Sequence, residues 1–206
     1  MRVYHLDDLT ERLGTPTAVC LGVFDGVHVG HRRLIAEAVR VAGEKGLEAL
    51  AHTYDPLPMR VIHPNAPACD LTPVDLRLRL FEGAGAQSAA VSRFDDALMH
   101  MPGREFFERV LLDKLNARHI VVGFNHAFGY HADTHTEKLR ELCREHGVGL
   151  SVIPPVRLDD GRLVSSSAIR AALLRGDLDE AREMLGREPE PELLACLRDS
   201  VGSGAQ

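Results

Sequence analysis

Short apolar runs alternate with longer segments of helical periodicity along most of this chain. Strands that are hydrophobic nearly throughout are typical of a parallel sheet covered by helices on both faces, and strand–helix alternation is the pattern of crossover connections. The sequence therefore predicts an α/β fold with a doubly wound parallel sheet of about five strands. The expected strands are Thr17 to Val23, Leu47 to Thr53, Gln87 to Ser92, His119 to Gly123 and Val148 to Ile153.

Helix start and stop signals lie between these strands. Apolar residues recur at helical spacing from Arg33 to Glu44, and Gly46 follows as a stop. Further helices are expected from Thr72, with Pro73 at the first position, and from Thr134. Another helix is expected between these two. One of its sides is apolar and consists of Phe106, Phe107, Val110, Leu111 and Leu115. The N-terminal segment MRVYHLDDLTERLG looks like an acidic helix.

The pattern changes after the last expected strand. Pro154-Pro155 ends the sheet, and Asp160-Gly161 predicts a tight turn between two short strands. Two short helices follow, Ala168 to Arg175 capped by Ser166 and Leu178 to Leu185 capped by Asp177. The sequence thus predicts one domain over residues 1–187, with a small hairpin and short C-terminal helices. The tail over residues 188–206 is expected to hold at most one helix before a disordered end.

The balance of charge argues against a nucleic-acid partner. Lys and Arg number 24 and Asp and Glu 30, so the formal charge is 24 − 30 = −6, whereas a protein that binds phosphate backbones broadly is basic. The N-terminus lacks the basic and apolar regions of a signal peptide, and no apolar stretch is long enough to cross a membrane. The widely spaced Cys20, Cys69, Cys143 and Cys196 are expected to be reduced thiols. We therefore expect a cytoplasmic protein.

The segment Gly22 to His31, GVFDGVHVGH, joins the first expected strand to its crossover helix. Ligands of open parallel sheets bind beyond the carboxyl ends of the strands, where the N–H groups of a helix start suit a phosphate. Gly26 and Gly30 allow the backbone to approach a ligand. His28 and His31 are spaced to donate hydrogen bonds to one anion. Such a pair suits nucleotidyl transfer, which needs alignment and charge stabilisation; one core and one surface histidine is the alternative.

Two later segments also place polar groups at the end of a strand or at the start of a helix. VGFNHAFG, which ends at Gly129, follows the fourth expected strand, and the amide of Asn125 can bond a ribose or a phosphate. VSSSAIR, from Val164 to Arg170, puts hydroxyls at a helix start with a guanidinium one turn later, where it can bridge two phosphate oxygens. A capping serine and a solvent-facing arginine are the alternative for this segment.

Taken in order, these motifs resemble those of the bacterial FAD synthetases. The resemblance is to the FMN adenylyltransferase module of the bifunctional riboflavin kinase/FAD synthetase family, in the H-x-G-H nucleotidyltransferase superfamily. TYDPLP, from Thr53 to Pro58, is similar to the family's TFDPHP, and LTPVDLRLRLF to its L-T-x-x-x-x-(K/R) helix. FDDALMHMPGREFF, VGFNHAFG and VSSSAIRAALLRGDLDEAREMLGR also resemble family motifs, so the likeness runs from Ala18 to Arg187.

The resemblance implies a Rossmann-like nucleotidyltransferase that transfers AMP from ATP to FMN and gives FAD and pyrophosphate. ATP and FMN are the implied substrates, and Mg²⁺ is implied with the triphosphate, without an assigned protein ligand. The implied catalytic residues are His28, His31, Asn125, Ser167 and Arg170. The implied substrate-binding residues are Gly22, Phe24, Asp25, Gly30, Tyr54, Asp55, Pro56, Pro58, Gly123, Val164 and Ser166.

Several of these roles have structural alternatives. In the family interpretation Asp25 lies near the nucleoside, whereas a carboxylate at this position can also bond the amides of its own turn. TYDPLP would lie near the flavin ring with Tyr54 as a flat face, or form only a rigid turn. His126, His131, Asp133 and His135 could also suggest a transition-metal site, although their spacing does not match one on a single element.

Three positions depart from the family pattern. Leu57 replaces a histidine, His126 an aromatic residue and Ser167 a threonine. The first two fall in the expected flavin region, so two other functions stay open. One is adenylyl transfer to another phosphate-bearing small molecule, and the other is a catalytically weak sensor that binds flavin or adenine nucleotide.

The kinase module of the bifunctional proteins follows the segment equivalent to Leu185 to Arg187. Residues 188–206, 19 in all, cannot form such a module. We therefore expect no riboflavin kinase activity from this sequence, and a separate riboflavin kinase that supplies FMN. The sequence favours no particular oligomeric state.

Overall fold

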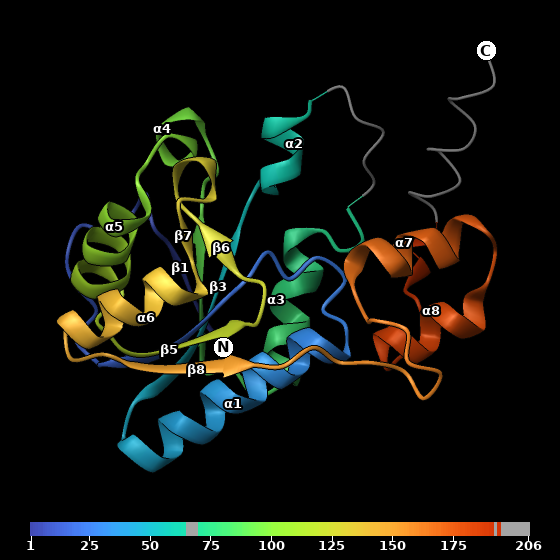
Figure 1. Cartoon of the computed structure of the whole chain (residues 1–206), viewed down its shortest axis with the longest axis horizontal. Coiled ribbons are helices and arrows are strands. Elements are labelled where there is room, and N and C mark those ends of the chain that lie inside the picture. Colours follow the sequence, from blue (N-terminus) through green and yellow to red (C-terminus); the bar gives the residue numbers. More distant parts are fainter. Residues whose placement is uncertain (65–69, 192, 195–206) are drawn as a thin grey trace.

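The computed structural model describes residues 1–64, 70–191 and 193–194. Six parallel strands form one sheet in the order β1-β4-β3-β2-β5-β8, with helices on both faces (Figure 1). The strands are β1 (Arg2–His5), β2 (Thr17–Leu21), β3 (Glu48–Tyr54), β4 (Ser88–Ser92), β5 (Ala117–Gly123) and β8 (Gly149–Ile153). The doubly wound α/β prediction is confirmed, with one strand more than expected.

Alternate residues of the central strands belong to two different hydrophobic cores. Val19 and Ile120 pack on the face that is covered by helix α6 (Thr136–Glu145) and the π-helical segment η1 (Phe106–Lys114). Cys20 and Val121 pack on the opposite face, under α1 (Val29–Lys45) and α3 (Val74–Gly83). Because both faces are covered, the central strands are buried along most of their length and are mostly apolar.

The crossover helices form where expected, with shifted starts. α1 begins earlier than predicted because the side chain of His28 caps it, and it ends at Gly46, whose φ of 65° is left-handed. α3 begins after Pro73, which is the N-cap residue and not the first helical one. α6 begins at Thr136 because Thr134 and His135 form β7, which pairs with β6 (Ala127–Phe128) in a small antiparallel hairpin.

The helix expected around Phe106 is present as α5 (Gly103–Glu105) and η1, which continue one another. All five apolar residues predicted for its inner side are buried against the sheet, namely Phe106, Phe107, Val110, Leu111 and Leu115. Two short helices were not predicted, α2 (Pro58–Ile62) and α4 (Asp96–Met99).

The expectation of a helix at the N-terminus is wrong. The first residues form β1, which pairs in parallel with β4 at the edge of the sheet, with Val3 opposite Ala89. Most β1 side chains are exposed or half-buried, so the strand has no marked hydrophobic pattern. The partner that makes it a strand is distant in the sequence, and local propensity gives no sign of such a pairing.

The C-terminal part packs as a separate cluster beside the sheet (Figure 1). The turn at Gly161, with φ of 86°, brings Arg157 and Leu163 into an antiparallel bridge, so only short antiparallel segments flank it. They lead into α7 (Ser166–Leu174) and α8 (Leu178–Leu185). Asp177 caps α8 as predicted, by accepting from the N–H of Glu180.

The predicted cap of α7 is wrong by one residue. Ser165 caps this helix, since its hydroxyl accepts from the N–H of Ala168, and Ser166 is instead the first helical residue. The last helix expected in the tail lies mostly outside the described residues. Cys69 and Cys196 also lie outside them, whereas Cys20 and Cys143 are free thiols in the interior. In the part of the chain that is described, no helix has the length and hydropathy needed to cross a bilayer.

Candidate active site

A cavity of about 390 Å³, the strand-end cavity, lies beyond the carboxyl ends of β2, β5 and β8. Leu21, Gly123 and Ile153 line it at the strand ends, and Gly30 and Ser166 line it at the starts of α1 and α7. Neither helix has an acidic residue in its first turn. The cavity therefore faces free N–H groups and the positive ends of two helix dipoles, an arrangement that favours an anion.

His28 and His31 lie together at this helix start. The Nδ1 atom of His28 accepts from the backbone N–H of His31 at 3.2 Å, which makes His28 the N-cap residue of α1. Because Nδ1 is the acceptor, the proton of the neutral ring lies on Nε2. The two rings stack with centroids 3.6 Å apart and planes 13° from parallel. Both line the cavity, so the predicted pair is assembled at one place.

Burial keeps both rings neutral in the free protein. It lowers the pKa of His28 to about 4, and burial together with the neighbouring His28 lowers the pKa of His31 well below its usual value. Each neutral ring still offers one N–H donor. Gly30 lies over this pair, and a Cβ atom there would come within 3.1 Å of the His28 ring. A larger residue in place of this glycine would therefore have to displace the ring of the first histidine by a few tenths of an ångström.

The loop before α1 contains left-handed residues that are not glycine. Phe24 and Val27 have φ values of 57° and 39°, and Gly26 has 87°. Such conformations are costly for a side chain with a Cβ and persist only where other contacts impose them. Here the guanidinium of Arg187 donates to the carbonyls of Gly26 and Val27, at 2.8 and 3.1 Å. Thr72 accepts from the N–H of Gly26 at 2.9 Å.

Asp25 connects the segment Gly22 to His31 with the segment VSSSAIR through hydrogen bonds. Its buried carboxylate accepts from Arg170 at 2.6 Å and from the N–H of Thr72 at 3.0 Å, and its carbonyl accepts from the Ser166 hydroxyl at 2.7 Å. Burial raises the pKa of the Asp25 carboxyl, and the nearby Arg170 opposes that shift. The carboxylate therefore bonds to an amide and a guanidinium beside the cavity rather than lining it, and the two motifs are in direct contact.

The residues predicted from sequence divide into three groups. Most line the strand-end cavity: Gly22, His28, Gly30, His31, Gly123, Asn125, Val164, Ser166 and Ser167. Phe24, Asp25 and Arg170 lie next to this cavity and are not part of its lining. TYDPLP is split, because Tyr54 and Pro58 line a second cavity whereas Asp55 and Pro56 line a third one together with Arg93.

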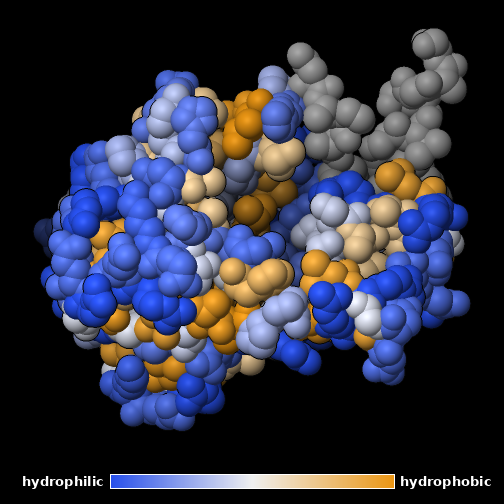
Figure 2. All heavy atoms as spheres, viewed as in Figure 1, coloured by the Kyte–Doolittle hydropathy of each residue, from blue (hydrophilic) through white to orange (hydrophobic). Residues whose placement is uncertain are grey.

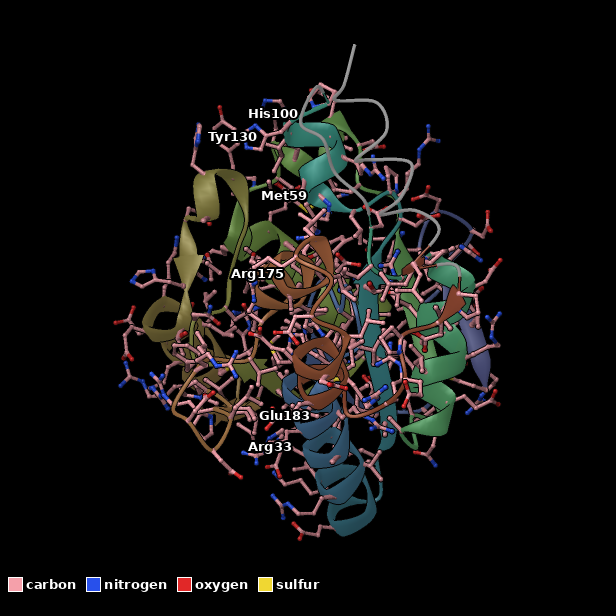
Figure 3. The ribbon with its side chains drawn as sticks, turned by 90° about the vertical axis from the view of Figure 1, so that its right-hand side faces the viewer. Arg33, Met59, His100, Tyr130, Arg175 and Glu183 are labelled. Carbon is pink, nitrogen blue, oxygen red and sulfur yellow. The ribbon has the colours of Figure 1, made fainter. Side chains whose placement is uncertain are left out.

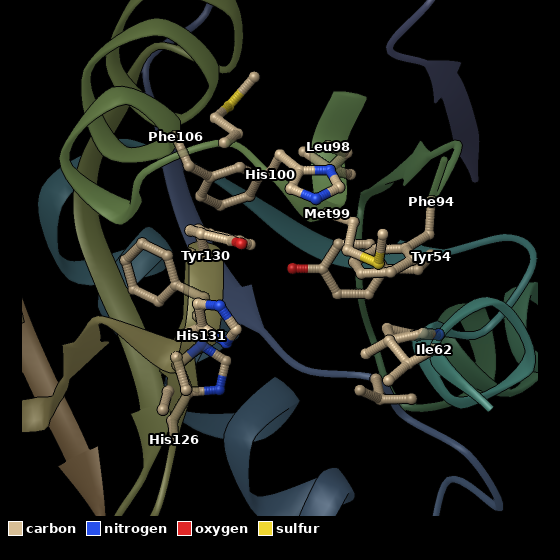
Figure 4. A pocket seen from close by; sticks show the side chains of 17 residues that line it. Tyr54, Ile62, Phe94, Leu98, Met99, His100, Phe106, His126, Tyr130 and His131 are labelled. Atoms are coloured by element: carbon tan, nitrogen blue, oxygen red, sulfur yellow. The ribbon is translucent and has the colours of Figure 1, made fainter. Parts of the chain in front are cut away.

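The second cavity, the aromatic cavity, has a volume of about 490 Å³. Figure 4 shows Tyr54, Ile62 and Phe94 on one side, facing Phe106 and Tyr130 on the other. In the side view of Figure 3, Met59 of α2, His100 and Tyr130 gather at one end of the molecule. Figure 2 shows a recess with hydrophobic residues in its depth between this end and the α7–α8 helices.

Sequence reasoning missed most of the aromatic cavity. Phe94, Leu98 and Met99 belong to FDDALMHM and Tyr130 to the turn after β6, and apolar residues of this kind are ordinarily assigned to the core. The only available signal was the resemblance of the FDDALMHM segment to a family motif. Pro154 and Pro155, interpreted only as a stop, also line the strand-end cavity.

The two cavities share three lining residues, Val23, His126 and Ala127. The two cavities are therefore adjacent at these residues. Within the described residues, no three or more His, Cys, Asp or Glu side chains gather as a metal site, and this includes the group around His131 and Asp133.

Buried neutral histidines should make the fold sensitive to acid. The pKa is lowered by burial to about 4 for His28 and His126 and to about 3 for His52. Between pH 6.5 and 4 the unfolded chain binds more protons than the native one, so the free energy of unfolding falls as the pH decreases. Each histidine contributes up to about 1.4 kcal/mol per pH unit in that window. Urea unfolding at a series of pH values measures this slope.

His52 offers a specific control for that slope. It is fully buried, and its Nε2 lies 2.7 Å from the Ser92 hydroxyl. His52→Gln removes a titrating group, and its side-chain amide can still form a hydrogen bond with the Ser92 hydroxyl. The unfolding free energy of this variant should therefore fall less steeply below pH 6.5. A slope equal to that of the unchanged protein would contradict the assignment.

Known proteins resemble this chain in sequence and in fold. A family model described as FAD synthetase matches residues 11–168. The chain belongs to the FAD synthetase family. A bifunctional riboflavin kinase/FMN adenylyltransferase of Bacillus subtilis is 29% identical over 91% of this chain and 58% of its own length. A FAD synthetase of Listeria monocytogenes is 28% identical over 90% of this chain and 75% of its own length. The chain thus spans less than two thirds of the first of these relatives.

Solved structures share the fold of this chain. A crystal structure described as a macrolide-efflux protein from Streptococcus pneumoniae superposes with a TM-score of 0.80 at 26% identity, over 91% of this chain and 60% of that one. A pantothenate synthetase from Thermus thermophilus, with 16% identity and a TM-score of 0.52 over 100% of this chain and 83% of that one, shares the fold. The resemblance inferred from the motifs is confirmed.

Proposed function

We propose that this FAD synthetase family member is an FMN adenylyltransferase. An oxygen of the FMN phosphate attacks the α-phosphorus of ATP in line. One P–O bond forms, the bond from the α-phosphorus to the bridging oxygen breaks, and FAD and pyrophosphate result. The observation that carries the proposal is the meeting of the two cavities at Val23, His126 and Ala127, because one cavity suits a triphosphate and the other a flat apolar ring.

The strand-end cavity is proposed to hold ATP. The Nε2–H of His28, a ring N–H of His31 and the hydroxyls of Ser166 and Ser167 can donate to phosphate oxygens beside the N–H groups of the two helix starts. Mg²⁺ bound to the phosphates would offset their charge. Arg170, whose guanidinium bonds to the Asp25 carboxylate beside this cavity, is proposed to act on the triphosphate as well.

The aromatic cavity is proposed to hold the flavin ring. Its volume of about 490 Å³ lies in the range of roughly 300–1,000 Å³ that is usual for small-molecule sites. Tyr54 stands edge-on to both His52 and Phe94, so its ring is fixed by packing on one side and borders the cavity on the other. Asn125, in the strand-end cavity next to the shared His126, is placed to contact the reacting phosphates.

Direct turnover tests the proposal. The purified chain is incubated with ATP, Mg²⁺ and FMN, and FAD and pyrophosphate are quantified together. We expect both products in equal amounts, and none with riboflavin, which lacks the attacking phosphate. Turnover only with another phosphate-bearing acceptor would replace FMN in the proposal. Binding of FMN or ATP without turnover would favour the sensor. A cytoplasmic location and a separate source of FMN stay predictions from the sequence.

A further inference from the structure

His126 lies where the two cavities meet. Of the three residues that line both, Val23 and Ala127 have no polar group in their side chains, whereas His126 has an imidazole. In Figure 4 its ring lies beside that of His131, on the side of the cavity opposite Ile62. The junction therefore contains a hydrogen-bonding side chain in a wall that is otherwise apolar.

The backbone of this residue is held firmly. The N–H of His126 donates to the carbonyl of Gly123 at 3.1 Å, and the N–H of Phe124 donates to the carbonyl of Ile153 at 3.0 Å. The ring also packs against Phe128, with centroids 5.7 Å apart. A tight turn tied to the ends of β5 and β8 thus fixes where the ring enters the junction.

The imidazole of His126 lacks a hydrogen-bond partner for one of its nitrogens. Its Nε2 atom is enclosed and makes no hydrogen bond with any part of the chain that the structure describes. Burial lowers the pKa of this histidine to about 4, so the ring is neutral near pH 7 and carries one N–H and one acceptor nitrogen. An enclosed polar atom without a partner is unfavourable, and a ligand that enters the junction can supply the partner.

We propose that His126 binds the phosphate of the acceptor molecule, and so fixes the attacking oxygen between the two cavities. This inference rests on the proposed function, in which the acceptor's ring occupies the aromatic cavity and ATP the strand-end cavity. The acceptor's phosphate must then lie at the residues common to both. A neutral ring N–H can donate to a phosphate oxygen there, which an aromatic hydrocarbon at the same position cannot do.

The test compares two flavins that differ only in the phosphate. Dissociation constants of FMN and riboflavin are measured by quenching of flavin fluorescence without ATP or Mg²⁺, for the unchanged protein and for His126→Phe. Phenylalanine keeps a ring of similar size and removes the nitrogens. We expect FMN binding to weaken by about 10- to 100-fold, the usual contribution of a hydrogen bond to a charged group, while riboflavin binding changes less than about twofold.

Two further variants make the outcome specific. His126→Gln keeps an N–H donor and should retain most of the preference for FMN over riboflavin. This variant therefore still tests the proposal if His126→Phe fails to fold. His100→Phe makes the same replacement at the aromatic cavity but away from the strand-end cavity, so any change in affinity should be equal for the two flavins.

If His126→Phe changes the dissociation constants of FMN and riboflavin equally, or changes neither, the role of His126 is overturned. The proposed function would not be affected by that result. If the unchanged protein binds neither flavin, the flavin acceptor itself is wrong, and the inference about its phosphate fails with it.

Discussion

Replacing His28 by alanine is expected to reduce AMP transfer by about 100- to 1000-fold, which is the usual effect of removing one well-placed donor to a developing charge. His28 lines the strand-end cavity, and its Nδ1 accepts from the N–H of His31, so the donor left for a phosphate is Nε2–H. The loss should appear mainly in kcat, because charge on the transferring phosphoryl group increases in the transition state. Initial rates of pyrophosphate release at saturating ATP and FMN measure it.

The same substitution also removes the N-cap of α1, which by itself costs about 1 kcal/mol of stability. His28→Asn separates the two effects. Asparagine is among the best N-cap residues and can accept from the N–H of His31, but its shorter side chain does not reach the place of Nε2. We expect His28→Asn to melt close to the unchanged protein and still to lose about 100-fold or more in rate. Full activity in His28→Asn would remove this histidine from the mechanism.

Replacing Arg77 by leucine is expected to lower the free energy of unfolding by about 3 kcal/mol or more. This arginine is only 1% exposed, and it donates to the Thr53 hydroxyl at 2.7 Å and to the carbonyls of Tyr54 and Thr72 at 2.8 and 3.2 Å. Leucine fills a similar apolar volume but leaves these buried acceptors without a donor, and each one costs about 1–3 kcal/mol. The expected decrease in Tm is roughly 10 °C for a chain of this size.

Arg79 provides the matched control for that experiment. It lies on the same helix, α3, and its side chain is exposed. Arg79→Leu should change the unfolding free energy by less than about 0.5 kcal/mol, as is usual for surface substitutions. Equal effects of the two substitutions in urea unfolding would mean that the hydrogen bonds of Arg77 do not stabilise the fold. Because Arg77 joins the end of β3 to α3, its loss should also weaken ligand binding at Tyr54.

Much of the fold could be predicted from periodicity. Strands β2, β3 and β4 are buried at every position and are mostly apolar, and this double burial produces the pattern from which they were predicted. β1 could not be predicted, since its exposed side chains carry no pattern and its pairing with β4 depends on a distant segment. The start of α6 was misplaced for the same reason, because Thr134 pairs with Phe128 across a hairpin.

The candidate site was predictable to the extent that its chemistry is local. H-x-G-H places two imidazoles and a glycine within one turn of helix, and the structure gathers His28, Gly30 and His31 at one cavity. The role of Asp25 could not be settled in this way. Its partner Arg170 is 145 residues away, and only folding brings the two together.

The sequence by itself determined the doubly wound architecture, the histidine pair at the start of α1 and the family, because each of these depends on residue types at short, fixed spacing. Only the tertiary structure decided that Phe94, Leu98 and Tyr130 form a cavity and that His126 lies where it meets the strand-end cavity. Apolar side chains look alike in a sequence whether they fill a core or surround an open space. The difference depends on what packs against them, and distant parts of the chain supply that packing.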